Sequence, residues 1–266
     1  MTTVAVVGHV EWVHFLRVDR PPARGDVIGA ERISVHAGGG AVVAAAVLAQ
    51  LGATVELFCA LGSDANGDAA EAELAQRGIA IHAVRRPGPT REVITFLDED
   101  GERTIVTIGA RLAPHGSDDL SWDRLRELDG VYLTAGDAGA VHNARAAPVL
   151  VATPRVREQL NDHELILDAL VLSASDASER GWARRLASGA RLIVQTEGAD
   201  GGRWRGESEG RWDAVTPPGP ARDSYGCGDA FAAGFTYGLA RGLPAAGAAD
   251  IGARCGAEML TRVGGP

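Results

Sequence analysis

The most informative segment of the sequence is Asp223-Ser224-Tyr225-Gly226-Cys227-Gly228-Asp229-Ala230-Phe231-Ala232-Ala233-Gly234. After Asp229 the composition is that of a helix, and two glycines stand just before it. Glycines at a turn let the backbone bend tightly and approach a ligand without a Cβ in the way. The N–H groups of Gly226, Cys227 and Gly228 would point forward at the helix start, where the macrodipole favours an anion. The stretch therefore predicts an anion-binding turn.

Asp229 stands in the same turn, where a carboxylate would repel a bound phosphate. Its position makes chemical sense for a general base that removes the proton from a hydroxyl group as that hydroxyl attacks the bound phosphoryl group. The alternative is a helix-capping aspartate worth about 1 kcal/mol, which is the commoner meaning of this spacing when it stands alone.

The composition narrows the class of protein. The chain has 266 residues, of which 45% are apolar and 23% charged, so it can form an ordinary globular core, and we expect one domain over residues 1–266. The formal charge of −9 gives no basic footprint, so we expect neither nucleic-acid nor membrane partners. All 26 positive side chains are arginine. The absence of lysine excludes P-loop, protein-kinase and pyridoxal-phosphate chemistry.

Cysteine usage points to a reducing compartment. Cys59, Cys227 and Cys255 are odd in number and far apart, with no zinc or disulfide pattern. The longest apolar run, 41–49, is too short to span a membrane, and the first residues have the pattern of a strand rather than of a signal peptide. We therefore expect a cytoplasmic protein.

Short β-branched runs alternate with alanine-rich stretches, which predicts an α/β fold with a mostly parallel sheet. The expected strands are Val4–Val7, Val55–Ala60, Gly130–Thr134, Val149–Ala152, Leu165–Leu172 and Leu192–Thr196. The expected helices are Gly40–Leu51, Ala65–Arg77, Pro154–Leu160, Asp176–Leu186, Cys227–Arg241 and Ala245–Leu260.

Two stretches depart from this alternation. Residues 10–36 contain strand-like pieces, and residues 90–109 contain two β-rich runs that flank the turn Asp98–Gly101. They predict a small β-layer, a lid that could cover a ligand cleft. Ordinary edge strands of the main sheet remain the alternative.

The stretch Asp223–Asp229 resembles the signature D-T-x-G-A-G-D of the ribokinase-like (PfkB-type) carbohydrate kinases, with Ser224 for Thr and Cys227 for Ala. Further similar motifs follow in the family's order: Gly38-Gly39-Gly40 before an alanine-rich helix, Gly62-Ser63-Asp64 with Gly67, Thr196 to Gly201 as T-x-G-x-x-G after a strand, and Thr261 to Gly265 at the end of the last helix. The resemblance extends over residues 4–266.

The resemblance implies a three-layer α/β/α fold with a small β-lid formed by about 10–36 and 90–109. It implies an enzyme that transfers the γ-phosphoryl group of ATP to a primary hydroxyl of a sugar or sugar derivative. Asp229 would be the catalytic base and residues 226–228 the anion hole. Thr196, Gly198 and Gly201 would hold the nucleotide. Lid-to-lid homodimers are common in the family, so a homodimer is one expected assembly.

The implied ions are divalent and monovalent. Mg²⁺ would be held mainly by ATP phosphates and water. Asp223 falls where many members bind a monovalent cation such as K⁺. The family's N-x-x-E motif is aligned with Ser173-Ala174-Ser175-Asp176, which gives Ser173 to the nucleotide and Asp176 to the metal.

The sugar end departs further from ribokinase-type members. The glycine pair Gly38-Gly39 is retained, but Glu11 and Val13 stand where those members have Asn and Asp, and Val43 stands for another Asn. Glu11 is either a ligand of sugar hydroxyls or a solvated charge at a strand end. Because valine cannot replace the hydrogen bonds of asparagine, the substrate is not expected to be ribose.

Three alternatives remain open at this point. An apolar Val13/Val43 pocket would suit a nucleoside kinase. A sugar or nucleotide sensor on the same fold would keep the binding site without turnover. Cys227, a thiol at a helix start, could have a depressed pKa and act as a nucleophile, although the matching family residue is an inert alanine.

Overall fold

The computed structural model describes residues 1–99, 101–156, 165–186 and 189–265. Its largest element is a central sheet in the order β13-β12-β11-β10-β9-β8-β1-β4-β5. The strands are β1 (Thr3–Val7), β4 (Thr54–Gly62), β5 (Ala80–Arg86), β8 (Gly130–Leu133), β9 (Leu150–Ala152), β10 (Leu167–Ser173), β11 (Ala190–Thr196), β12 (Gly202–Gly206) and β13 (Gly210–Trp212). Neighbours pair in parallel from β5 to β11, and β12 and β13 add an antiparallel hairpin at one edge.

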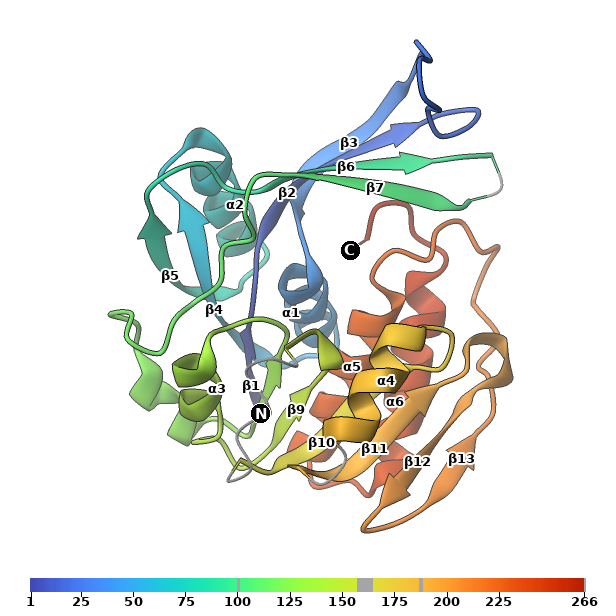
Figure 1. Ribbon diagram of the computed structural model, residues 1–266. Helices are drawn as coiled ribbons and strands as arrows, with labels where there is room; N and C mark the ends of the chain where they lie inside the picture. The colour runs from blue at the N-terminus through green and yellow to red at the C-terminus, as the bar shows by residue number, and fades with distance from the viewer. Residues whose placement is uncertain (100, 157–164, 187–188, 266) are drawn as a thin grey trace.

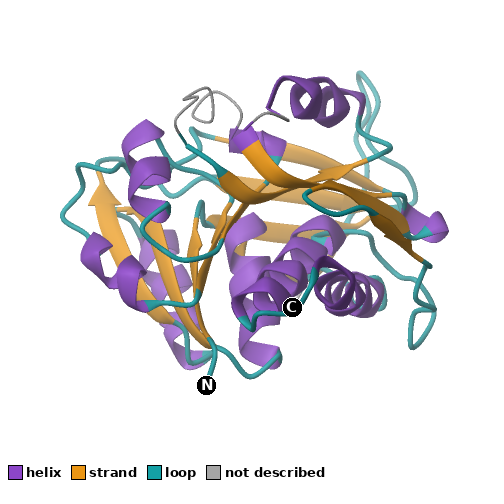
Figure 2. Cartoon of the chain, turned by 90° about the horizontal axis from the view of Figure 1, so that it is seen from below, coloured by secondary structure: helices purple, strands orange, loops and turns teal. Residues whose placement is uncertain are grey.

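Helices cover both faces of this sheet (Figure 2). One layer contains α1 (Gly40–Gln50), α2 (Ala65–Gln76), α5 (Cys227–Ala240) and α6 (Ala245–Met259). The other contains α3 (Ala138–Ala144), α4 (Ala177–Leu186) and the 3-10 turn η1 (Trp122–Glu127). The parallel strands contribute side chains to both cores, which is why their sequences are nearly continuous Val/Leu runs.

A second, four-stranded sheet projects from the main body in the order β3-β2-β6-β7 (Figure 1). Its strands are β2 (Glu11–Arg17), β3 (Glu31–Gly38), β6 (Glu92–Leu97) and β7 (Arg103–Ile108). Alternate residues of β2 point inward, and Val13 and Phe15 form a small core with Val93. We call this sheet the lid.

The motif Gly62-Ser63-Asp64 with Gly67, which follows β4, has a structural role. The Asp64 carboxylate accepts a hydrogen bond from the N–H of Gly67 (3.0 Å) and so caps α2. The hydroxyl group of Thr90, at the base of the lid, also donates to Asp64 (2.7 Å). The motif therefore ties the start of α2 to the chain that enters β6.

The predicted α/β/α arrangement, with a mostly parallel central sheet and a small lid, is confirmed. The sequence did not predict β5 or α3, and of the expected helix Pro154–Leu160 the structure describes only the 3-10 turn η2 (Pro154–Val156). Residues 157–160 of that prediction, and residue 100 of the predicted hairpin turn, lie outside the described residues. Within the described ranges, none of the helices combines the length and the apolar character needed to cross a lipid bilayer.

Candidate active site

The turn before α5 is shaped by its glycines. Gly226 has φ 75°, the left-handed conformation that favours glycine, and it stands at the N-cap of α5. A Cβ on Gly226 would lie 2.9 Å from the methyl groups of Val43, so α1 supports the turn from behind. A Cβ on Gly228 would meet nothing within 4 Å. The N-terminus of α5 is therefore backed on one side and open on the other, as an anion site requires.

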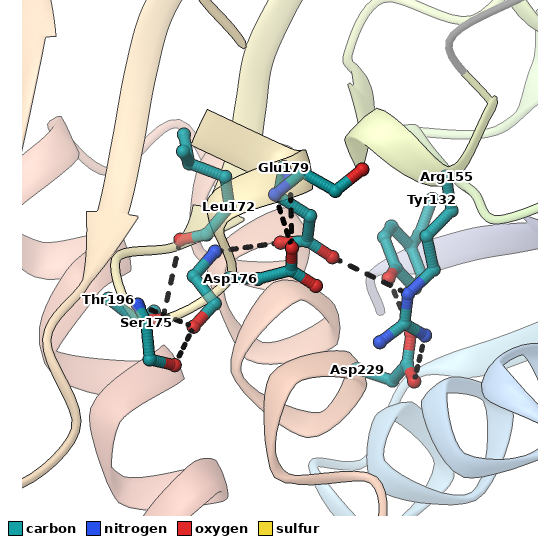
Figure 3. Close-up of polar contacts among 10 residues, drawn as sticks. Tyr132, Arg155, Leu172, Ser175, Asp176, Glu179, Thr196 and Asp229 are labelled. Carbon is teal, nitrogen blue, oxygen red and sulfur yellow. Dashed lines mark hydrogen bonds and ion pairs between the residues drawn. The ribbon is translucent and has the colours of Figure 1, made fainter. Parts of the chain in front are cut away.

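Asp229 lies in the first turn of α5 and is only 6% exposed. The hydroxyl of Tyr132, at the middle of the sheet on β8, donates to its Oδ1 (2.8 Å), and Nη1 of Arg155 donates to its Oδ2 (3.2 Å) (Figure 3). Burial, followed by the charge of Asp229, raises the pKa of Tyr132 well above its usual value. The phenol therefore remains a hydrogen-bond donor and fixes the orientation of the carboxylate.

A second carboxylate faces the same arginine. Oε1 of Glu179, from α4, lies 3.6 Å from Nε of Arg155, and its Oε2 accepts a hydrogen bond from the backbone N–H of Ser173 (2.8 Å) (Figure 3). Glu179 is a site residue that the sequence motifs did not predict. The four-residue spacing assigned to Ser173–Asp176 occurs again three residues later as Asp176-Ala177-Ser178-Glu179, and this second alignment ends on the carboxylate at the site.

The start of α1 also lies against Asp229. A Cβ on Gly40 would lie only 2.8 Å from Oδ1 of Asp229. The N–H of Gly39, which has φ 93°, donates to the hydroxyl oxygen of Tyr225 (2.9 Å) in the glycine-rich turn. Glycines in both segments therefore allow the two helix starts to meet at one carboxylate.

Glu11 stands at the base of the lid and is 9% exposed. Its Oε1 lies 3.2 Å from Nη1 of Arg91 and 4.0 Å from Nε2 of His9. Burial raises the pKa of Glu11, and Arg91 opposes that shift. Of the two interpretations of Glu11, the structure therefore excludes the solvated strand-end charge.

His9 is a buried neutral imidazole. Burial and the positive charge of Arg111 lower its pKa to about 3. Among the residues that the structure describes, Nδ1 of His9 has no hydrogen-bond partner. A polar nitrogen without a partner in a buried position is available to a ligand.

His9 should make stability depend on pH. Its unfolded-state pKa is 6.5 and its folded-state pKa about 3, so only the unfolded chain takes up a proton between these values. The free energy of unfolding therefore begins to decrease as the pH falls below 6.5, and the decrease reaches about 2 kcal/mol at pH 5. Chemical denaturation of the His9→Gln variant at pH 7 and 5 should show a smaller loss than wild type. The control His115→Gln, at an exposed histidine, should behave as wild type; equal losses in all three proteins would contradict the assignment.

The residues predicted to shape an apolar substrate pocket lie elsewhere. Val13 is 0% exposed and Val43 is 1% exposed. Val13 packs against Gly38 in the lid, and Val43 packs against Gly226. In the structure, Val43 supports the glycine-rich turn and presents no surface to a substrate, because side chains that are already packed cannot line an open pocket. The two valines therefore do not form an apolar pocket for the base of a nucleoside.

The two aspartates predicted to bind metal ions are engaged by backbone groups. Asp223 is 3% exposed, and its oxygens accept from the N–H groups of Tyr225 (2.8 Å) and Gly264 (3.0 Å), which fastens the glycine-rich turn to the C-terminal turn. Oδ1 of Asp176 accepts from the N–H groups of Ser178 (2.8 Å) and Glu179 (3.0 Å) and so begins α4. Both side chains position the loops that carry the site.

The residues predicted to bind the nucleotide lie at the carboxyl end of β11. Thr196 donates through Oγ1 to the carbonyl of Leu172 (3.3 Å) (Figure 3). Gly198 begins a 3-10 turn with φ 61°, and a Cβ there would meet nothing within 4 Å. Gly201 has φ 79°, and a Cβ there would lie 2.1 Å from the carbonyl oxygen of Trp212. Gly201 is therefore required for the β12–β13 hairpin, whereas Gly198 is open to a ligand.

Cys227 does not have the properties of a nucleophile. Burial raises the pKa of its thiol to about 11, against the depression expected at a helix start. The Cys227→Ala variant should therefore keep turnover within a few-fold of wild type in a steady-state assay. A complete loss of turnover would restore the covalent alternative.

Comparison with known proteins agrees with this geometry. The chain matches the model of the pfkB family of carbohydrate kinases over residues 1–161 and 159–265. It is 31% identical over 258 residues to an ATP-dependent ribose-1-phosphate kinase of Halopiger xanaduensis, covering 88% of this chain and 84% of that protein. It is 30% identical over 231 residues to the acarbose 7(IV)-phosphotransferase of an Actinoplanes species, covering 76% and 72%. A ribokinase structure from Thermotoga maritima has a TM-score of 0.80 at 19% identity and covers 99% of this chain and 94% of its own.

The chain belongs to the PfkB family of carbohydrate kinases. It is an ATP-dependent sugar kinase by family, and the predicted enzyme class is confirmed at that level. Its substrates are accordingly ATP and a sugar, and kinases of this family use a divalent metal with ATP.

Proposed function

We propose that the protein transfers the γ-phosphoryl group of ATP to a primary hydroxyl of a sugar or sugar derivative, with Asp229 as the general base. The names of the two relatives give ribose 1-phosphate and acarbose as their acceptors, and we take both to be sugar derivatives of this class. Asp229 accepts the hydroxyl proton, and the N–H groups of residues 226–228 offset the charge on the transferred group.

One observation carries the proposal. A buried carboxylate, oriented by the hydroxyl of Tyr132, lies in the first turn of a helix whose N-terminus is open at Gly228. Base and anion site are thus parts of the same helix start. Glu11 and His9 lie in the segment that leads from β1 into the lid, next to the Gly38–Gly40 turn that contacts Asp229. We assign the sugar to this side and the nucleotide to Thr196 and Gly198.

The proposed divalent ion is Mg²⁺. Within the described ranges, no group of three His, Cys, Asp or Glu side chains could hold an ion by itself. Mg²⁺ usually keeps several waters and binds through substrate phosphates and one or two carboxylates. Glu179, a partly buried carboxylate that shares Arg155 with Asp229, fits this pattern, and the ion would offset charge on the phosphates. The proposed K⁺ site at Asp223 is supported by the resemblance alone.

The acceptor is found by an assay of ADP release over a panel of sugars, sugar phosphates, oligosaccharides and nucleosides. Release with a sugar or sugar derivative supports the proposal, and release with nucleosides alone supports the nucleoside kinase. Tight binding of a sugar without ADP release in the presence of MgATP would identify a sensor and contradict the proposal.

Gly228→Ala separates the phosphate site from the fold. A Cβ at Gly228 meets no atom within 4 Å, and alanine stabilises a helix by up to about 1 kcal/mol relative to glycine. Thermal unfolding should therefore be unchanged or shifted upward. If the phosphoryl group lies at this helix start, the methyl group displaces it, and kcat should fall by up to about 10²-fold. Wild-type kcat in a stable Gly228→Ala variant would contradict the anion site.

The lid supplies the surface for the proposed homodimer. The edge strand β7 is exposed along its whole length, and Ile105, Val106 and Ile108 are 43%, 45% and 50% exposed. An apolar, unpaired edge strand favours association with a second copy. Light scattering should give a dimer for wild type and a monomer for Val106→Lys.

We also propose the cytoplasm as the compartment, in line with the unpaired cysteines.

A further inference from the structure

Arg155 joins the two carboxylates of the site. It lies in η2, the 3-10 turn that follows β9 at the carboxyl edge of the central sheet. Its Nη1 is 3.2 Å from Asp229 and its Nε is 3.6 Å from Glu179 (Figure 3). The side chains of these two acids are 8% and 14% exposed, whereas that of Arg155 is 46% exposed. The guanidinium group therefore covers one buried and one partly buried acid at the edge that faces solvent.

The neighbouring acids keep Arg155 charged. The negative charge of Asp229 is the largest cause that raises the pKa of the guanidinium group, so it stays protonated at any pH at which the enzyme works. In return the arginine balances a carboxylate that would be costly to bury alone. Asp229 keeps its orientation when Arg155 leaves, because Tyr132 holds the other oxygen.

Transfer of a phosphoryl group needs positive charge beside the group that moves. The chain has no lysine, so a side-chain cation at this site must be an arginine. The attacking hydroxyl must contact Asp229, and the phosphorus atom must lie next to that hydroxyl. A cation that already touches Asp229 is therefore within reach of the transferred group.

We propose that Arg155 is a catalytic residue that changes partner during turnover. In the structure it pairs with Asp229. When ATP binds, the guanidinium group turns to a non-bridging oxygen of the γ-phosphoryl group, while its Nε remains beside Glu179. The exchange frees Oδ2 of Asp229 for the acceptor hydroxyl and brings a positive charge to the phosphoryl group. This inference rests on the proposed function.

The chemical step balances without a proton from Arg155. The hydroxyl proton of the sugar goes to Oδ2 of Asp229, and the sugar oxygen forms the new bond to the γ-phosphorus. The bond from that phosphorus to the bridging oxygen breaks, and its electron pair stays on ADP. Arg155 contributes charge and hydrogen bonds only, as an arginine that stabilises the transition state does.

The test uses the Arg155→Ala and Arg155→Lys variants, with Arg254→Ala as the control at an exposed arginine on α6. We expect Arg155→Ala to lower kcat by about 10²–10³-fold with an unchanged KM for the sugar. Added guanidinium ion should restore part of this kcat and should leave the control unaffected. Arg155→Lys should be intermediate, because an ammonium group cannot hold Glu179 and a phosphate oxygen with a planar fork.

Calorimetry of nucleotide binding adds a readout that needs no turnover. Arg155→Ala should bind ADP as wild type does and ATP more weakly. Suppose that wild type releases no ADP with any acceptor, while Arg155→Ala still binds ATP more weakly than wild type does. In that case the proposed function fails, and the contact of Arg155 with the terminal phosphate stands. The inference is overturned if Arg155→Ala keeps or raises kcat, or if its loss of kcat resists guanidinium and is accompanied by an equal loss of ADP and ATP affinity.

Discussion

Asp229→Asn should lower kcat by about 10²–10⁴-fold, the usual cost of removing a positioned base. The change keeps the size of the side chain and its hydrogen bond from Tyr132, but an amide cannot accept the hydroxyl proton at neutral pH. ATP affinity should be close to that of wild type or higher, because a negative charge has left the neighbourhood of the phosphates. Steady-state kinetics and calorimetry on the same preparation measure both quantities.

Asp223→Asn is the matched control for this prediction. Asp223 is also a buried aspartate of the same turn, but its oxygens accept hydrogen bonds from the backbone at Tyr225 and Gly264. An amide keeps only one acceptor oxygen, so this variant should lose stability and retain a larger fraction of kcat than Asp229→Asn does. If Asp229→Asn turns over as wild type does, Asp229 is a helix cap and not the base.

Gly40→Ala should lower kcat by about 10²-fold, the effect of a displacement of roughly 1 Å at a reacting group. A Cβ on Gly40 would lie 2.8 Å from Oδ1 and 3.1 Å from Cγ of Asp229, so the carboxylate must move. The same Oδ1 accepts the hydrogen bond from Tyr132, so a displaced carboxylate disturbs that bond as well. The test measures kcat together with the midpoint temperature of thermal unfolding.

Gly29→Ala is the control for this substitution. A Cβ on Gly29 meets no atom within 4 Å, so this variant should keep both kcat and stability. If Gly40→Ala keeps a wild-type kcat, the close approach of α1 to the proposed base has no catalytic meaning.

Local sequence patterns predicted the larger part of the fold. The helix expected at 65–77 ends where the pattern places it, because Gly78 takes φ 75° as a helix C′ residue does. The continuous apolar runs of β1 and β10 are those of strands covered on both faces. Strand β5, with the sequence AIHAVRR, was missed because an edge strand is only half-buried and lacks such a run. Whether a helix or strand is predicted thus depends on residues that are close together in the chain.

The candidate site could be predicted only where one motif contains it. Gly226, Gly228 and Asp229 lie within four positions, and their order alone indicates an anion site beside an acid. Tyr132 and Arg155 are 97 and 74 positions away from Asp229 and reach it only through the order of the strands. Nothing local marks either of them as a partner of the acid.

The most direct test is a crystal structure with ADP, aluminium fluoride and the sugar that the acceptor panel identifies. We expect the aluminium fluoride at the N–H groups of residues 226–228, the acceptor hydroxyl on Oδ2 of Asp229, and Arg155 turned from Asp229 to the aluminium fluoride. A fluoride group bound away from the start of α5, or an acceptor hydroxyl that does not touch Asp229, would contradict it.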